Sequence, residues 1–186
     1  MLRPLVLILA LLVPAVAFAA PWKIDPSTTV AVDVGWKGST VTVKFPSISG
    51  TIDFDQNAPD RARAEIEVAT ADATTGVPVV DLLVRGQDYL GAGQWPAITF
   101  HLDKLTQTSK STARVSGRIT MRGVTLPENF DATVFRFGPS KDDPQRFEAG
   151  FDILGSIDRT AFGSTGGVPD VASVLPVRIH LLMTSS

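Results

Sequence analysis

Histidines, serines and paired carboxylates are the residues of this sequence that could carry catalysis or hold a metal ion. The two histidines, His101 and His180, each lie at a polar position in a segment of alternating apolar and polar residues. A zinc site would need a further histidine or carboxylate ligand that converges on them. The sequence has neither an H-x-H nor an H-E-x-x-H spacing. We therefore expect exposed strand histidines and no metal site.

The serines and carboxylates do not form a recognisable catalytic arrangement either. Residues 163–167 read Gly-Ser-Thr-Gly-Gly, which lacks the nucleophile pattern of a hydrolase. Neither this segment nor Gly91-Ala92-Gly93 has the lysine of a phosphate-binding loop. Asp142-Asp143 falls in a polar loop, and Glu65 and Glu67 share the outer face of an alternating segment. We expect no enzyme activity, since no group of residues supports one.

Composition removes further kinds of chemistry. The 186 residues include no cysteine, which excludes thiol catalysis, iron–sulfur clusters and disulfide bonds. With 17 basic and 19 acidic residues, the formal net charge is −2. Nucleic-acid binding requires a basic patch that neutralises phosphates. We therefore expect neither a nucleic-acid partner nor a cofactor.

Residues 1–19 have the pattern of a cleavable export signal. Arg3 precedes an apolar run at residues 5–18, and Ala17-Phe18-Ala19 forms an A-x-A cleavage site. The run is shorter than the roughly 20 apolar residues of a membrane-spanning helix. We expect cleavage after Ala19, export of the protein, and one domain at residues 20–186.

Alternation of apolar and polar residues dominates the rest of the chain. Because this period of two is typical of strands with one buried face, it predicts an all-β fold. Glycine, proline, asparagine and aspartate separate the segments, as turns require. An open sheet of this size would leave long edges exposed, so we expect a closed antiparallel barrel of about eight strands. The predicted strands are residues 30–36, 41–45, 48–54, 64–68, 98–102, 115–121, 130–137, 147–153 and 177–181.

One segment departs from this pattern. Between residues 79 and 90 the apolar residues have a spacing closer to helical than to alternating. Pro78 precedes the segment and Gly91 follows it, as is typical of the two ends of a helix. Gly86 weakens its middle. We predict one helix, or two short ones, at about 79–90, near an opening of the barrel.

Large aromatic side chains share the apolar face of several predicted strands: Trp36, Phe45, Phe54, Phe100 and Phe151. They could simply form a packed core. Alternatively, the interior of such a barrel exceeds the volume of its side chains, because small residues on the same face leave room beside the large ones. This second interpretation predicts an apolar tunnel for a lipid chain. The small residues in question are Gly50, Ala64, Gly117 and Ala149.

Five motifs follow one another along residues 22–182. They are WKIDPS at 22–27, STVTVKFPSISGTIDFD at 39–55, the paired segments 81–90 and 95–100, GRITMRGVT at 117–125 and IDRTAFG at 157–163. Together they resemble the YceI family of periplasmic, polyisoprenoid-binding, lipocalin-like proteins. Each motif alone is weak, but their shared order makes the resemblance specific.

This resemblance implies an antiparallel barrel of about eight strands, closed near one end by the helix, with an elongated apolar pocket. It further implies a periplasmic protein without catalytic turnover, which binds or carries an isoprenoid lipid such as a polyprenol, a quinone or a precursor. A homodimer remains open. The candidate ligand-contacting residues are Trp36, Phe45, Phe54, Tyr89, Trp95, Phe100, Ile119, Phe151 and Arg159.

Recognition of the ligand's head group is less well defined than that of its tail. Members of the family often carry an arginine and a histidine in the helix where this chain has Val80 and Leu83. This departure favours an apolar tail over a charged head as the recognised part of the ligand. Arg85 and Arg159 remain, and each could bond a neighbouring loop or carboxylate, or contact an anionic head group.

Two other functions remain open from the sequence. One is a non-catalytic stress or structural factor whose barrel is fully packed and holds no ligand. The other is an outer-membrane barrel, which places apolar residues outward between aromatic girdles. The single tyrosine, Tyr89, and the lack of an aromatic residue at position 186 disfavour this last alternative.

Overall fold

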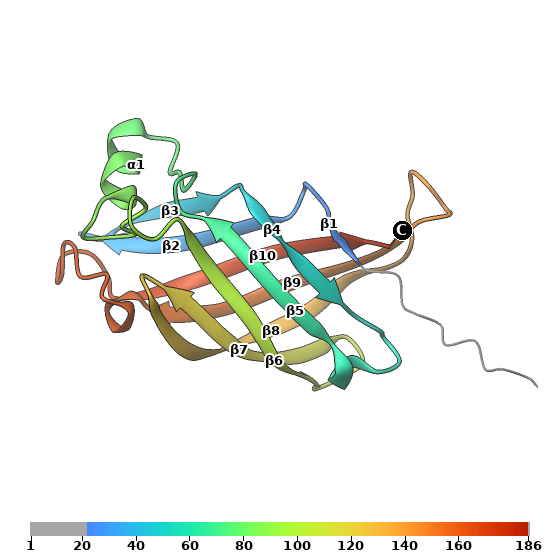
Figure 1. Ribbon diagram of the computed structural model, residues 1–186. Coiled ribbons are helices and arrows are strands. Elements are labelled where there is room, and N and C mark those ends of the chain that lie inside the picture. Colours follow the sequence, from blue (N-terminus) through green and yellow to red (C-terminus); the bar gives the residue numbers. More distant parts are fainter. Residues whose placement is uncertain (1–21, 186) are drawn as a thin grey trace, which may run out of the picture.

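The computed structural model describes residues 22–185 (Figure 1). The predicted export signal at residues 1–19 lies outside them. Within the described residues, ten strands, one α-helix and two short 3₁₀ turns follow one another. They are β1 (Lys23–Ile24), β2 (Thr29–Trp36), β3 (Ser39–Phe45), β4 (Ile48–Asp53), η1 (Pro59–Arg61), β5 (Arg63–Ala69), α1 (Pro78–Arg85), β6 (Ala97–Gln107), β7 (Thr112–Met121), β8 (Val124–Pro139), β9 (Phe147–Asp158), η2 (Arg159–Phe162) and β10 (Val174–Thr184).

All ten strands belong to one antiparallel sheet that is strongly curled. Its order is β3-β2-β10-β9-β8-β7-β6-β5-β4, and β1 pairs with the far end of β10. The curl brings the two ends of the sheet together, because Trp22 beside β1 forms an isolated bridge with Ile52 of β4. Figure 1 shows the strands wrapped around a common interior. The predicted all-β class and the inward curl are therefore confirmed.

Two details of the predicted barrel need correction. The sheet has ten strands rather than about eight, partly because β1 is only two residues long and is too short to show alternation. The barrel is also not closed by a continuous ladder of hydrogen bonds between the two ends of the sheet. Among residues 22–185, β3 and β4 stand at opposite ends of the sheet order with no ladder between them. Only Pro46 and Ser47 separate these two strands, and proline has no N–H to donate to a ladder.

The helix is shorter than predicted. It begins at Pro78 as expected, but it ends at Arg85. Gly86 follows in an extended conformation, and its N–H donates to the carbonyl of Leu83. Residues 86–96 then form turns that lead to β6, and we call them the α1–β6 segment. The glycine that weakened the helical pattern is the residue that stops the helix. None of the described helices has the length and apolarity needed to cross a membrane.

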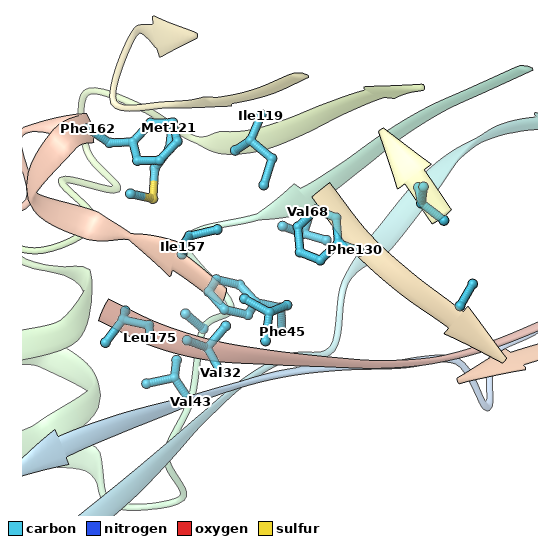
Figure 2. Packing of buried hydrophobic residues seen from close by; sticks show 14 residues of the cluster. Val32, Val43, Phe45, Val68, Ile119, Met121, Phe130, Ile157, Phe162 and Leu175 are labelled. Carbon is cyan, nitrogen blue, oxygen red and sulfur yellow. The ribbon is translucent and has the colours of Figure 1, made fainter. Parts of the chain in front are cut away.

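Apolar side chains of the strands point to the inside of the curl (Figure 2). One large cluster includes Phe45, Ile119, Phe130 and Phe162. A smaller cluster lies at the end of the barrel that holds β1, where Ile52, Ala149 and Met183 are buried with Trp22, Phe54 and Phe151 packed against them. We call this the β1 end, and we call the opposite end, which holds α1, the α1 end (Figure 1).

Charged side chains occupy the outer face of the sheet. Arg118 pairs with Asp103 at 2.9 Å, and Arg178 pairs with Asp33 at 2.8 Å. His180 Nδ1 lies 2.6 Å from Asp152, and His101 lies beside Glu65 and Asp103. Both histidines are therefore on the outside of strands, as predicted. Within residues 22–185, no group of three or more histidine and carboxylate side chains is arranged to hold a metal ion.

Candidate functional site

A cavity of about 470 Å³ runs inside the curled sheet. Its wall is almost entirely apolar and comes from the inward-facing positions of the strands and from α1. It extends to Ile24, Phe54 and Met183 at the β1 end, and to Val80 and Leu83 at the α1 end. The volume is within the range of about 300–1,000 Å³ that is usual for small-molecule sites. Alternation explains the wall, since every second strand residue faces the same interior.

Eight of the nine predicted ligand-contacting residues line this cavity. Each of the eight comes from a different strand, turn or loop, so only the fold brings them together. Trp36 stands at the α1 end, where 51% of its surface remains exposed. Phe54 and Phe151 stand at the β1 end, with their ring centroids 5.5 Å apart. The eight are Trp36, Phe45, Phe54, Tyr89, Phe100, Ile119, Phe151 and Arg159.

Trp95 is the exception, and its placement corrects the prediction. It lies at the end of the α1–β6 segment and does not belong to the cavity wall. The guanidinium of Arg122 stacks over its ring at 4.4 Å. Gly91 and Gly123 lie against the same indole, close enough that an added Cβ would contact it. Trp95 therefore holds the α1–β6 segment against the β7–β8 turn, outside the cavity wall.

The small residues do not create the space in the way predicted. Ala64 lines the cavity, whereas Gly50, Gly117 and Ala149 do not. The ring of Phe100 covers Gly117, since a Cβ added there would lie 2.5 Å from two ring carbons. Ala149 is fully buried in the smaller cluster at the β1 end. The empty volume therefore comes from the curl of the whole sheet. The space beside Gly117 is filled by the ring of Phe100.

Arg159 is the principal polar residue at the α1 end of the cavity. Its side chain is only 3% exposed, and it donates four hydrogen bonds to main-chain carbonyls. All four acceptors lie in residues 163–173, which we call the η2–β10 loop. They are Ala172 (2.7 Å), Ser164 (2.8 Å), Gly166 (2.9 Å) and Val171 (3.0 Å). Burial lowers the pKa of this guanidinium, but arginine stays charged in proteins.

The α1–β6 segment is tied to the barrel by two arginines. Arg122 donates from Nη1 to the carbonyls of Gln87 (2.6 Å) and Tyr89 (2.9 Å). On the other side, the guanidinium of Arg159 lies 5.7 Å from the centre of the Tyr89 ring. The main-chain N–H of Gly166 in the η2–β10 loop donates to the main-chain carbonyl of Asp88 at 2.9 Å. These contacts fix Tyr89 where its ring borders the cavity.

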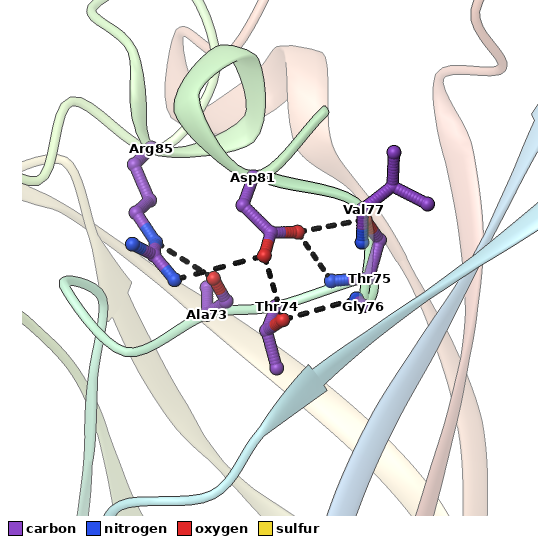
Figure 3. A network of polar contacts seen from close by, with 7 residues as sticks. All are labelled: Ala73, Thr74, Thr75, Gly76, Val77, Asp81 and Arg85. Carbon is purple, nitrogen blue, oxygen red and sulfur yellow. Dashed lines mark hydrogen bonds and ion pairs between the residues drawn. The ribbon is translucent and has the colours of Figure 1, made fainter. Parts of the chain in front are cut away.

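Asp81 holds α1 itself in place (Figure 3). Its buried carboxylate accepts hydrogen bonds from Thr75 N (2.6 Å), Thr75 Oγ1 (2.7 Å) and Thr74 Oγ1 (2.7 Å). These bonds, the one from the Thr75 amide foremost, lower the pKa of Asp81 below its ordinary value. Arg85 donates to the carbonyl of Ala73 at 2.8 Å and lies 3.9 Å from Asp81. Arg85 is therefore structural.

The anchoring roles of Asp81 and Arg122 could not be derived from the sequence in this detail. Asp81 stands four residues before Arg85, which suggests a pair on one helix face, but the two threonines it binds precede the helix. Arg122 occupies a left-handed position at a φ of 53°, directly before Gly123 in the β7–β8 turn. A turn was predictable there, whereas the contact with Trp95 and Tyr89 depends on the tertiary fold.

A comparison with known families matches residues 22–183 to the YceI-like domain. The chain belongs to the YceI family. A UPF0312 protein of Pseudomonas putida strain GB-1 is 32% identical over 164 residues, which cover 84% of this chain and 83% of that protein. Another UPF0312 protein, from Pseudomonas fluorescens strain Pf-5, is 33% identical over 130 residues, or 67% of this chain and 65% of the relative.

Solved structures show the same YceI fold at lower sequence identity. BcnA of Burkholderia cenocepacia superposes with a TM-score of 0.77 at 20% identity, over 86% of this chain and 99% of BcnA. A polyisoprenoid-binding domain from Saccharophagus degradans has a TM-score of 0.66 at 16% identity, over 91% and 100% of the two chains. At these identities the likeness supports the curled β fold alone.

Proposed function

We propose that this YceI-family protein is an exported, non-catalytic carrier that binds an isoprenoid-type lipid inside the barrel. The ligand is a polyprenol, a quinone or a precursor of one. The observation that carries the proposal is the continuous apolar cavity between α1 and the β1 end. Its length and lack of polar wall suit a long hydrocarbon chain, whose transfer from water stabilises the complex by about 0.8 kcal/mol per buried methylene. The polyisoprenoid-binding neighbour in S. degradans supports the same ligand class.

The polar groups at the α1 end favour an uncharged or weakly polar head group. Arg159 has five N–H donors, and four of them already bind carbonyls of the η2–β10 loop. It can therefore offer at most one further hydrogen bond, which excludes the two-point grip that guanidinium groups give to phosphates and carboxylates. Arg85 faces Ala73 and Asp81 instead of the cavity. This arrangement fits a prenol hydroxyl or a quinone carbonyl better than a pyrophosphate.

The alternative of a packed barrel without ligand is disfavoured by the same cavity. A packed interior has few voids larger than a water molecule. Here the interior of the described domain contains a cavity of about 470 Å³, and the side chains along most of its wall are apolar. An empty volume of this size would cost stability without a function.

Native mass spectrometry tests the proposal directly. Protein purified without detergent should carry an additional mass that matches a prenol or a quinone, and delipidated protein should take up a prenol analogue at one molecule per chain. If the protein is repeatedly recovered without lipid, and takes up neither a prenol analogue nor a quinone analogue, the carrier function is contradicted. Export is tested separately by the mass of the isolated chain and by its cell fraction. Cleavage after Ala19 and recovery from the periplasm are the expected results.

A further inference from the structure

Exposed apolar side chains gather on the outer surface of the α1 end. Val79 and Leu82 of α1 are each 72% exposed, and Leu83 is 56% exposed. Trp36 at the tip of β2 and Val168 in the η2–β10 loop are about half exposed. The isolated bridge between Trp36 and Val171 places the tip of β2 against this loop. We call these five residues the outer apolar patch.

The patch is continuous with the cavity wall. Val80 and Val84 of α1 point into the cavity, whereas Val79 and Leu82 of the same helix face outward. Leu83 and Trp36 belong to both surfaces, since each lines the cavity and remains exposed. A helix that is apolar on two sides is unusual at the surface of a globular protein, where one side normally faces water. An apolar chain could therefore move from outside to inside without crossing a polar barrier.

Charges beside the patch are neutralised within the protein. Lys37, next to Trp36, pairs with Asp170 at 3.3 Å. Arg85 lies 3.9 Å from Asp81 on the same helix as Leu82. The patch thus has no free basic cluster of the kind that recognises anionic lipids, and no acidic cluster for a basic protein. A half-exposed tryptophan at its edge is typical of residues at the level of lipid head groups.

We propose that the outer apolar patch docks on the surface of an electrically neutral phospholipid bilayer and opens the cavity toward it. The inference goes beyond ligand binding but rests on the proposed function for its purpose, because a lipid with almost no solubility in water must be exchanged at a surface. Contact is hydrophobic rather than electrostatic. Binding should therefore be insensitive to salt, unlike the attraction of a polybasic surface to anionic lipids.

Flotation with phosphatidylcholine vesicles provides the test. A chain that begins at Ala20 keeps every described element and removes the apolar run at residues 5–18, which could bind vesicles by itself. Leu82→Asp should lower the vesicle partition coefficient at least about tenfold, since a buried leucine side chain contributes that much or more to transfer from water. Leu154→Asp is the matched control. Leu154 is 54% exposed on the outer face of β9, away from α1, so its replacement should leave partitioning unchanged.

Uptake of a prenol analogue from detergent-free solution, measured on the same variants, separates this inference from the proposed function. Leu82 does not line the cavity, so Leu82→Asp should keep uptake from solution while losing vesicle binding. Vesicle binding without uptake would overturn the carrier function and leave the docking surface standing. Uptake without vesicle binding, or binding that Leu82→Asp does not reduce, would overturn the docking surface.

Two further outcomes would also overturn the docking proposal. If the protein binds only vesicles with anionic lipid, and salt abolishes that binding, the attraction is electrostatic and comes from another surface. If sedimentation shows a dimer that Leu82→Asp converts to a monomer, the patch is an interface between two copies of this chain. A monomer that floats equally well at low and high salt is the result that supports docking.

Discussion

At the β1 end of the barrel, aromatic rings pack on one another, whereas at the α1 end charged side chains bind main-chain atoms. The Trp22 and Phe54 rings lie 6.3 Å apart, and Phe54 meets Phe151 edge-on at 5.5 Å. At the opposite end, Arg159 binds main-chain carbonyls of the η2–β10 loop, and Asp81 binds Thr74 and Thr75 before α1. Both ends meet the same apolar interior, and they limit it by different means.

The difference shows two ways in which one fold limits the same apolar cavity. Side chains that pack against each other occupy the space between strands, so packed aromatic rings limit the cavity at the β1 end. The hydrogen bonds that Arg159 donates and Asp81 accepts act within the surrounding loops and do not fill the cavity. The α1 end is therefore framed by hydrogen bonds to its loops, which suits the entrance that the proposed carrier function needs.

Removal of Arg159 should have the largest effect on stability. Arg159→Leu keeps the bulk of the side chain but leaves four main-chain carbonyls without donors. We expect a loss of about 4 kcal/mol in the free energy of unfolding, because each orphaned buried acceptor costs about 1–3 kcal/mol and the loop partly relaxes into water. Denaturant unfolding measures the loss. Amide exchange of Ala172, which donates to Gly35, should become faster.

Arg85→Leu is the control for this prediction. Arg85 stands at the same end, is partly exposed and has one main-chain acceptor. Its loss should cost about 1 kcal/mol. Equal effects of the two substitutions would mean that the frame around the entrance does not depend on Arg159.

The packed β1 end should respond next most strongly, to truncation of an aromatic ring. Phe54→Ala retains the main-chain carbonyl that accepts the Trp22 indole N–H at 2.7 Å, so the change removes packing alone. We expect a loss of about 3 kcal/mol, the lower end of the range for phenylalanine truncation, since the ring is only partly buried. Phe135→Ala is the matched control and should cost less, because Phe135 is 42% exposed and stacks on His180 on the outer face of the sheet. Similar losses for both variants would show that the β1 end is not packed.

Sequence patterns predicted the repeating parts of the molecule and missed the parts that depend on single contacts. Each predicted strand is present, because alternation reports directly on which face is buried. The same logic placed six candidate residues on the cavity wall, and the family resemblance added Tyr89 and Arg159. Trp95 was misplaced because no periodic pattern covers a turn, and its position is set by Arg122 from a distant hairpin.

The completeness of closure was also beyond prediction from the sequence. Alternation of apolar and polar residues indicates which face of a sheet is buried. It does not show whether the two strands at the ends of the sheet pair with each other. The Trp22–Ile52 bridge depends on a two-residue strand that has no pattern of its own. Similarly, helical spacing continued past Gly86, and only the main-chain geometry shows that the helix ends there.

Truncation of Phe100 should cost less stability than truncation of Phe54, which also lines the cavity but packs on two other aromatic rings. Phe100 packs edge-on against Phe130 at 6.2 Å and covers Gly117, but another part of its surface faces the empty volume. For Phe100→Ala we expect a loss of about 2 kcal/mol, because the new space merges with an existing cavity and fewer contacts are lost. Uptake of prenol analogues should shift toward bulkier chains. A loss above that of Phe54→Ala, with unchanged uptake, would indicate a packed interior.

The smallest effect should come from Asp81, and it should depend on pH. The hydrogen bonds from Thr75 and Thr74 hold the pKa of Asp81 in the folded protein below its ordinary value. A lowered pKa in the folded state stabilises the fold at pH values above the ordinary carboxyl pKa, and this contribution is lost as the pH falls through the lowered value. Asp81→Asn removes the charge. Its amide oxygen can still accept the two bonds from Thr75, though as a weaker acceptor, but its NH2 group cannot accept the bond from Thr74 Oγ1.

The measurement is the melting temperature of both proteins as a function of pH. At neutral pH the variant should melt slightly below the wild type, by less than Arg159→Leu, Phe54→Ala or Phe100→Ala. The difference in melting temperature between the two proteins should be constant from neutral pH down to the ordinary carboxyl pKa. Below that pH it should narrow, because the wild-type carboxylate then becomes neutral as well. The Thr75 amide should also exchange faster in the variant at neutral pH. A gap that stays constant into strong acid would show that Asp81 anchors α1 by shape rather than by charge, and the two ends of the barrel would then differ less than their contacts indicate.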